Sequence, residues 1–493
     1  MASIPKTLYF PLFLIISTFF VIAFSSCNDD IYSTNPKNKL SFSTDTLSFD
    51  TVFTTIGSAT SKILVYNRNN SALKISHIGI AAGKGSNFKI NVDGSLNADN
   101  QFENIEIRAK DSLYIFVSVT VDPNNSNSPV FIQDSIEFQT NGINQNIKLQ
   151  AFGQDIKILR NRYLLNDTTL TAEKPFLVYG YLAIDSLKTL TIKPGCKFYF
   201  HNNAYLVAYG NLKAIGTADE PIEMRGDRLD KIKFATPFPY NNVAGQWDGV
   251  YLLGKYGSHV LNHVNMNSGN VGIYFSNDDR SIIPTLEISN CRIHNFLLYD
   301  LVVQNGNITV TNSEISNSSS YSVYLNGGVH NFIQTTIANY FDKSTVQPTN
   351  RDKKPAVMIM NLNRVAPMQS FFQNCIITGS LDNEFSLASR FLDQYPGTFD
   401  NCYIRKSDSL NLPQFQKIRW AESNDTVFKS IRYDLDKNTY FDFRLDSISP
   451  ARGIGNKIDP IIIAKYHLDF DLNGNSRPAD NSDAGAYQWQ PTK

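Results

Sequence analysis

The sequence has no excess of charge of either sign. Its 493 residues include 45 Lys and Arg and 45 Asp and Glu, so the formal net charge is +0. Proteins that bind nucleic acid through its phosphates usually carry a basic surface. The balanced charge therefore argues against nucleic acid as a partner, and the sequence gives no reason to expect a cofactor.

The sequence also lacks a sustained helical pattern. No long stretch repeats apolar residues at the 3.6-residue spacing of an amphipathic helix. Aromatic residues make up 12% of the chain, with 24 Tyr and 33 Phe. These residue types favour strands, and the Asn, Ser, Thr and Gly found throughout favour turns. The sequence predicts an all-β protein, long enough for two or three domains.

The start of the chain is typical of an export signal. Lys6 precedes the apolar run LYFPLFLIISTFFVIAF, and two serines then precede Cys27. This ending resembles a lipobox, which implies cleavage after residue 26 and a diacylglycerol on Cys27. An ordinary signal peptide or a single membrane anchor remains open. The acidic stretch Asn28–Asp30 resembles tags that carry some Gram-negative lipoproteins to the cell surface. We therefore expect an outer-membrane, lipid-anchored protein that faces the cell exterior.

Two further segments precede the middle of the chain. Residues 27–40 are polar and are expected to form a tether. Residues 41–157 contain short runs such as KILVYN and SLYIFVSVTV, which alternate apolar and polar residues between turn residues. This pattern predicts a β-sandwich. The order of the runs resembles the Hydin-like immunoglobulin-type domains, which implies a spacer or binding module.

The middle of the chain contains a repeat. The peptide LEISNCRIHNF has counterparts in NCII and NCYI. Alignment on the last residue of NCRI gives an anchor column of Met266, Ile293, Ile315, Ile337, Ile377 and Ile404. Successive anchors are 22 residues apart at their closest, which is typical of one turn of a parallel β-helix. We expect this coil over 175–410, followed by a closing or capping segment over 411–493.

Three columns near the anchors predict how each turn of the coil is built. Five residues before the anchor stand Leu261, Ile288, Val310, Phe332, Phe372 and Phe399. Three before stand His263, Asn290, Asn312, Gln334, Asn374 and Asn401. Two before stand Val264, Cys291, Ser313, Thr335, Cys375 and Cys402. Because Asn tolerates left-handed backbone angles, this pattern predicts an apolar interior, a bend and a small inward residue. The cysteines are then expected to be buried free thiols rather than disulfides.

Longer segments resemble a known family. The stretch LTIKPGCKFYFHNNAYLVAYGNLKAIGTADEPIEM resembles the opening turns of pectate-lyase-like proteins, and GQWDGVYL resembles the start of their next turn. SPARGIG and DLNGNSRPADNSDAGAY resemble the closing segment of many secreted β-helix proteins. The resemblance implies a right-handed, single-stranded parallel β-helix. It does not specify an activity.

The outward positions of one strand per turn supply the best candidate site. Its column is predicted to run Tyr251, Tyr274, Val302, Tyr324 and Ile359. Polar residues beside it are Asp300, Gln304, Asn326 and Asn361. Aromatic faces with nearby amides suit sugar rings, although stacked tyrosines can simply stabilise strands. We expect a non-catalytic face that binds glycans or other cell-surface ligands, including surface protein complexes.

Two other functions remain open. Polysaccharide lyases and glycosidases on this fold place carboxylates, with Arg, Lys or Ca²⁺, along one outward face. Asp278 and Asp279 are neighbours in sequence rather than on facing strands, so no such arrangement is predicted. A structural role in outer-membrane assembly is the second alternative.

A calcium loop is a weaker possibility near the C-terminus. Its candidate ligands are Asp469, Asp471, Asn473 and Asp480. Asp480 stands where such a loop normally has Glu, so a hydrogen-bonded turn is favoured over a metal site.

Overall fold

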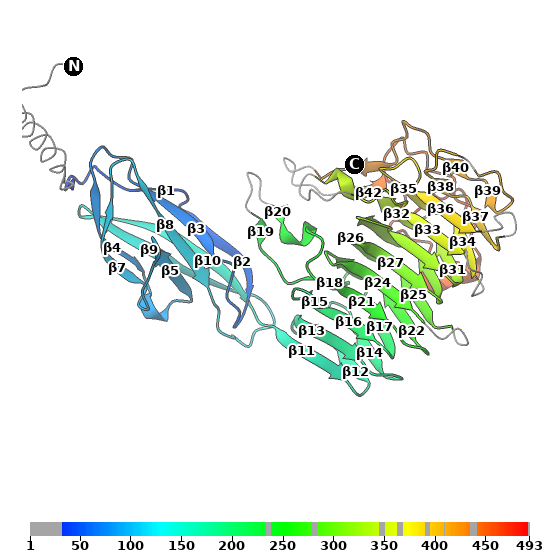
Figure 1. Ribbon diagram of the computed structural model, residues 1–493, viewed down its shortest axis with the longest axis horizontal. Coiled ribbons are helices and arrows are strands. Elements are labelled where there is room, and N and C mark those ends of the chain that lie inside the picture. Colours follow the sequence, from blue (N-terminus) through cyan, green and yellow to red (C-terminus); the bar gives the residue numbers. More distant parts are fainter. Residues whose placement is uncertain are drawn as a thin grey trace, which may run out of the picture. The chain divides into compact units, whose positions relative to one another are not determined.

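The computed structural model divides the chain into two compact units, residues 1–154 and 155–493 (Figure 1). The structure is all-β, as predicted, with one short α-helix, α2 (Pro460–Tyr466), and three single-turn 3-10 helices among the described residues. It describes residues 32–232, 238–277, 283–344, 351–361, 368–389, 395–408, 410–433 and 441–491. The predicted export signal, Cys27 and Asp278–Asp279 lie outside these residues. No helix in the described part is long and apolar enough to cross a bilayer.

The first unit is a β-sandwich of two five-stranded sheets. One sheet contains β1 (Ser41–Phe42), β3 (Ser61–Tyr66), β8 (Ser112–Val119), β5 (Phe88–Val92) and β6 (Ser95–Leu96). The other contains β2 (Thr46–Phe53), β10 (Ile143–Gln154), β9 (Val130–Thr140), β4 (Leu73–Ile80) and β7 (Gln101–Ile107). Alternate residues such as Ile63, Val65, Ile115 and Val117 are fully buried between the sheets, as the period-two pattern requires.

Part of the predicted tether belongs to this sandwich. The Ser33 amide donates to the Ala72 carbonyl at 2.9 Å. The Asn141 side-chain amide donates to the Asn38 carbonyl at 3.2 Å. Leu40 is buried in the sandwich core. Residues 33–40 therefore lie against the sandwich.

The second unit is a parallel β-helix with three sides. Its strands form sheets of 18 and 10 strands, and the larger sheet covers two sides. Side 1 contains β12 (Thr168–Leu170), β14 (Thr189–Ile192), β17 (Asn211–Ile215), β22 (Ser258–Asn262), β25 (Thr285–Ser289), β28 (Asn307–Thr311), β31 (Gly328–Ile333), β34 (Met368–Gln373), β37 (Gly397–Asp400) and β39 (Phe415–Gln416). Side 2 contains β15 (Lys197–Phe200), β18 (Ile222–Gly226), β23 (Val264–Asn267), β26 (Arg292–Phe296), β29 (Glu314–Ser318), β32 (Thr336–Asn339), β35 (Ile376–Gly379), β38 (Tyr403–Ile404) and β40 (Arg419–Trp420). Side 3 contains β16 (Tyr205–Ala208), β21 (Gly249–Leu252), β24 (Val271–Ser276), β27 (Tyr299–Gln304), β30 (Val323–Asn326), β33 (Val357–Asn361) and β36 (Phe385–Ser389).

The coil begins before the predicted residue 175. β11 (Lys157–Leu164) pairs in parallel with β13 (Phe176–Ile184), and β13 continues from side 2 to side 3 by pairing with both β15 and β16. A hairpin of β19 (Lys231–Ile232) and β20 (Phe238–Pro239) interrupts one turn between sides 2 and 3. From β22 to β36, each turn contributes one strand to each side, as β25, β26 and β27 do, and the last described strands of the coil, β37 to β40, lie on sides 1 and 2.

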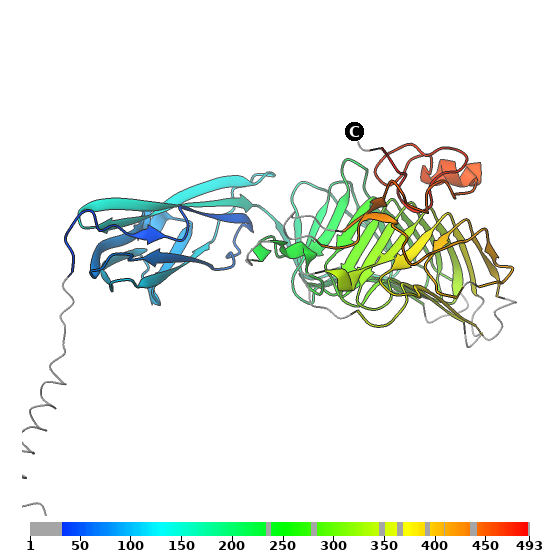
Figure 2. The same ribbon diagram turned by 90° about the horizontal axis from the view of Figure 1, so that it is seen from above.

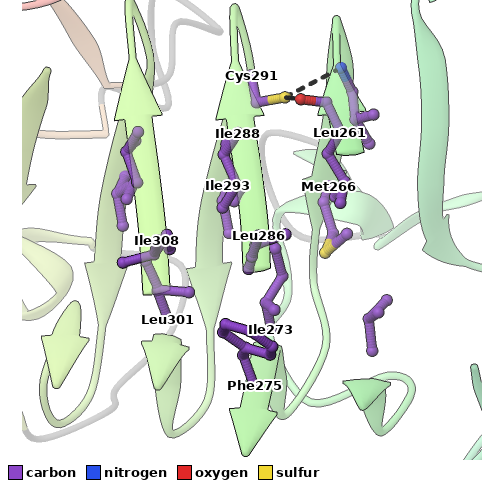
Figure 3. Packing of buried hydrophobic residues seen from close by; sticks show 14 of the residues in the cluster. Leu261, Met266, Ile273, Phe275, Leu286, Ile288, Cys291, Ile293, Leu301 and Ile308 are labelled. Carbon is purple, nitrogen blue, oxygen red and sulfur yellow. Dashed lines mark hydrogen bonds between the residues drawn. The ribbon is translucent and has the colours of Figure 1, made fainter. Parts of the chain in front are cut away.

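The register predicted from the repeat is confirmed. Neighbouring anchors are paired from Met266 through Ile293 and Ile315 to Ile404. The column five residues earlier is paired in the same way from Leu261 to Phe399. Both columns are buried in one continuous core, and the labelled side chains in Figure 3 gather in this interior.

The predicted bend is also confirmed. The six residues of its column have φ between 46° and 53°: His263, Asn290, Asn312, Gln334, Asn374 and Asn401. Some of their amides form a ladder along the coil. The Asn312 amide donates to Asn290 Oδ1 at 2.7 Å, and the Asn290 amide donates to Asn262 Oδ1 at 2.9 Å. The same left-handed backbone therefore joins sides 1 and 2 in these six turns.

The cysteines next to this bend are buried and free. The Cys291 thiol approaches the Ser289 and Leu261 carbonyls at 3.1 and 3.6 Å, and it accepts the Val264 amide at 3.4 Å (Figure 3). Ser313 in the same column donates to the Thr311 carbonyl at 2.7 Å. Except for Val264, the side chains of this column are small and hydrogen-bond backbone carbonyls at the corner. The sequence predicted small apolar filling alone.

The C-terminal segment folds back along the flank of the coil (Figure 2). It includes β41 (Phe428–Ser430), β42 (Asp442–Leu445) and α2. Bend residues bind it directly. The Asn374 and Asn401 amides donate to the Asn456 and Ile454 carbonyls, each at 2.7 Å. Arg477, which is buried, donates to Asn312 Oδ1 at 2.5 Å. The segment therefore covers the corner between sides 1 and 2 rather than the end of the coil alone.

Candidate binding sites on the coil

The predicted tyrosine column lies on the outer surface of side 3. Tyr251 pairs with Tyr274, Tyr274 with Val302, and Val302 with Tyr324. The three tyrosines are half-buried, and the Tyr251 and Tyr274 ring centroids are 6.0 Å apart. Burial, and secondarily the Asp248 carboxylate, raises the pKa of Tyr251. Its hydroxyl is therefore protonated at neutral pH.

Sequence reasoning missed four tyrosines on the same surface. The Tyr181–Tyr205 and Tyr205–Tyr251 centroids are 6.2 and 5.9 Å apart. Tyr299 and Tyr321 stack with an interplanar angle of 8°, and Tyr321 lies 5.6 Å from Tyr324. Tyr299 stands three residues before Val302, and Tyr321 stands three residues before Tyr324. This repeated spacing was the signal in the sequence that could have identified them. We call the whole set the tyrosine face: Tyr181, Tyr205, Tyr251, Tyr274, Tyr299, Tyr321 and Tyr324.

The amides beside this face are placed differently from one another. Gln304 pairs with Asn326, and both retain solvent exposure. Tyr324 pairs with Met358, whereas the predicted Ile359 pairs with Leu325 and is fully buried. A one-residue slip reverses the face of every residue in a strand. Asn361 accordingly falls one position out of register with Asn326, and its side chain lies outside the described residues.

Asp300 lies inside the coil rather than on the outward face. It is 0% exposed. Neither carboxylate oxygen has a well-formed hydrogen bond among the described residues, although the Ser322 and Ser318 hydroxyls lie close enough to favour the ionised form somewhat. Burial prevails and raises the pKa of Asp300 well above its usual value. Asp300 is therefore removed from the candidate binding face.

The residues considered for calcium form a hydrogen-bonded turn. The Asp471 carboxylate accepts the backbone amides of Asn473, Asn475 and Gln488 at 2.7 to 2.9 Å, and also the Asn475 side-chain amide. Asp469 and Asp480 are exposed. Within the described ranges, no group of three or more His, Cys, Asp or Glu side chains is arranged to hold a metal.

A second site, which the sequence did not predict, lies on the outer surface of side 2. It is a cleft of about 690 Å³ between β26, β29 and the C-terminal segment, and we call it the side-2 cleft. Its lining residues are Arg292, His294, Glu314, Ser316, Asn317, Lys429, Phe441, Asp442, Phe443, Arg444, Leu445, Asn473, Asn475, Tyr487, Gln488, Trp489 and Gln490. These residues are far apart in sequence, so no local pattern joins them.

The floor of the cleft is a connected polar network. Arg292 pairs in register with Glu314 on the next turn. Arg292 donates to Asn473 Oδ1 at 2.7 Å and to the Tyr487 hydroxyl at 3.3 Å. Tyr487 in turn donates to Glu314, which also accepts the Ser316 hydroxyl at 2.7 Å. Burial, and then the Glu314 charge, raises the pKa of Tyr487 well above its usual value.

One wall of the cleft holds an ion pair. Arg444 Nη2 and Nε donate to the two Asp442 oxygens at 2.5 and 2.8 Å. Burial pushes the pKa of Asp442 upward, but the Arg444 hydrogen bonds and the Lys429 charge outweigh it, so the pKa lies below its usual value. Both carboxylates that line the cleft therefore already accept hydrogen bonds from the protein.

Comparisons with known proteins do not assign either site. No protein-family model and no curated protein matches the sequence. The structure is similar to a family 123 glycoside hydrolase from Clostridium perfringens, at 12% identity over 24% of this chain and 26% of that one, with a TM-score of 0.16. It is also similar to PapD-like domain 7 of human CEP192, at 12% identity over 27% and 96% of the chains, with a TM-score of 0.17. Scores this low support no argument about either site.

We predict that Asp300→Asn stabilises the coil at pH 7. Because the folded-state pKa is raised, the folded protein retains a proton that the unfolded chain releases as pH rises above about 4. The resulting loss of stability grows with pH until the folded-state pKa is reached, and it amounts to about 1.4 kcal/mol for each unit of the shift.

Urea unfolding between pH 4 and pH 7, followed by tryptophan fluorescence, measures this effect, since Trp247, Trp420 and Trp489 all lie in the second unit. The advantage of the variant should shrink toward pH 4. Asp219→Asn, at an exposed turn, is the control and should change little. A variant less stable than the parent protein at pH 7 would contradict the assignment.

Proposed function

We propose that the protein is a lipid-anchored outer-membrane protein whose coil binds glycans through the tyrosine face, without catalysis. The proposed anchor rests on the apolar run and the two serines that precede Cys27. The sandwich would act as a spacer between this anchor and the coil. The observation that carries the binding function is the row of half-buried tyrosines along side 3, flanked by exposed amides.

The chemistry of the tyrosine face matches a sugar chain. Strands in a sheet lie about 4.8 Å apart, so aromatic rings on successive turns repeat at short, regular intervals. The apolar face of a sugar can pack on an aromatic ring while its hydroxyls bond nearby polar groups. Tyr274 and Tyr324 supply rings on either side of Val302. Gln304 and Asn326 supply amides two residues further along the same strands as Val302 and Tyr324. An extended glycan along the coil axis would contact several turns at once.

The family relationship is also a proposal. We infer that the coil belongs to the pectate-lyase-like superfamily and the sandwich to the Hydin-like domains. The three-sided parallel coil and the sequence motifs over residues 190–224 and 449–487 support the first relationship. The strand-like runs of residues 41–157 support the second.

The lipid anchor can be tested on protein purified from its native membrane. Mass spectrometry of the N-terminal peptide should find Cys27 as the first residue, carrying diacylglycerol. The Cys27→Ala variant should lose membrane attachment. A mature chain that begins elsewhere, or an unmodified Cys27, contradicts the anchor while leaving the glycan proposal untouched.

The tyrosine face can be tested by combining Tyr251→Ala, Tyr274→Ala and Tyr324→Ala. Aromatic contacts contribute about 0.5–1.5 kcal/mol each, so the triple variant should weaken binding to glycans identified on an array about tenfold or more. The matching triple Phe variant keeps the rings and should retain most of the affinity.

Two controls accompany this test. Tyr256→Ala removes a 59% exposed tyrosine outside the tyrosine face and should leave affinity unchanged. Tryptophan fluorescence establishes that each variant is folded. Binding of neutral glycans that survives the triple Ala substitution, or the absence of any glycan bound by the parent protein, would refute the proposed function.

A further inference from the structure

We propose that the side-2 cleft is a separate binding site for an acidic sugar, meaning a sugar ring that carries a carboxylate or sulfate. It lies on a different side of the coil from the tyrosine face and does not depend on the function proposed for that face. Its volume of about 690 Å³ is within the usual range of ligand sites, about 300–1,000 Å³.

The charge of the cleft favours an anion. Three cationic side chains line it, those of Arg292, Lys429 and Arg444, against the two carboxylates of Glu314 and Asp442. The carboxylates are engaged by the protein's own donors, Tyr487 and Ser316 for Glu314 and Arg444 for Asp442. The described hydrogen bonds of Arg292 go to two neutral oxygens, Asn473 Oδ1 and the Tyr487 hydroxyl. A ligand anion would therefore meet positive charge that the carboxylates do not fully balance.

A buried donor also points to a ligand. The Asn317 side chain lines the cleft and is 1% exposed. Its Oδ1 accepts the Tyr340 amide at 2.9 Å, but its Nδ2 has no hydrogen-bond partner among the described residues. A buried polar group without a partner costs about 1–3 kcal/mol. An acceptor on a bound ligand would remove that cost.

The remaining lining groups select a sugar rather than a small inorganic anion. The amide side chains of Asn475, Gln488 and Gln490 line the cleft, together with the Phe441 and Trp489 rings. Asn475 Nδ2 already donates to Asp471 and Gln488 Oε1 already accepts the Asp483 amide, so a sugar would bond to the other amide atoms of these two side chains. The Arg452 guanidinium lies over the Trp489 ring, 3.8 Å from its centroid, and this cation–π contact favours one orientation of the ring. Amides match the hydroxyls of a sugar, the rings match its apolar face, and the cations match its acidic group.

Isothermal titration of the full chain tests this inference with three disaccharide probes: one that contains glucuronate, one that is sulfated, and a neutral one of the same linkage. We expect the acidic probes to bind at least tenfold more tightly than the neutral one, and added salt to reduce that difference. Comparison of the two acidic probes identifies which acidic group the cleft prefers. Equal binding of all three probes, or binding of none at millimolar concentration, overturns the proposal.

Two substitutions locate the site, one that removes a positive charge from the cleft and one that removes a negative charge. Lys429→Gln should weaken binding of the acidic probe severalfold, whereas Asp442→Asn should strengthen it, because it removes a negative charge and releases Arg444. Lys213→Gln, an exposed lysine on side 1, is the matched control and should have no effect. The triple Ala variant of the tyrosine face should also retain this binding, which separates failure of one proposal from failure of the other. If Lys429→Gln and Asp442→Asn leave the affinity unchanged, the cleft is not the site.

Discussion

The left-handed backbone at the corner between sides 1 and 2 is the constraint on which most of the coil depends. From His263 to Asn401, six consecutive turns place a residue with φ near 50° at this corner. This conformation costs a residue with a Cβ about 1–2 kcal/mol, and the local hydrogen bonds of an Asn side chain offset part of that cost. Once the angle between sides 1 and 2 is fixed, the residues before and after the corner both point inward. The anchor column and the column before the bend can then stack in one core.

The same corner explains how the C-terminal segment is held. The Asn290 and Asn312 amides bond along the coil, to Asn262 and Asn290. Under the segment, Asn374 and Asn401 bond to its backbone instead, and Arg477 reaches Asn312. The segment then packs on the outward residues of side 2, such as Ile376 and Tyr403. It thereby forms the wall of the side-2 cleft, so the repeat that builds the coil also positions a site outside it.

The sequence predicted the coil near this corner because three requirements recur at fixed offsets: an apolar residue, a left-handed bend and a small hydrogen-bonding residue. It failed where no such marker exists. The excursion before β33 has no period, and the resulting slip placed Ile359 outward when the structure buries it. Asp300 was assigned to the surface because a charged residue is rarely buried alone. In the cleft, Arg292 contacts Asn473 and Tyr487, which lie 181 and 195 residues further along the sequence. Only folding brings these residues together.

The most direct test of this account is the stability of three variants, measured as urea unfolding followed by tryptophan fluorescence. Asn290→Gly removes the amide but tolerates φ of 53°, whereas Asn290→Ala removes the amide and adds the strain. Asn262→Ala removes the partner amide and leaves the bend residue intact. The account predicts that Asn290→Ala is about 1–2 kcal/mol less stable than Asn290→Gly, with Asn262→Ala destabilised less than Asn290→Ala. Equal stability of the Ala and Gly variants at position 290 would contradict the central role of the left-handed corner.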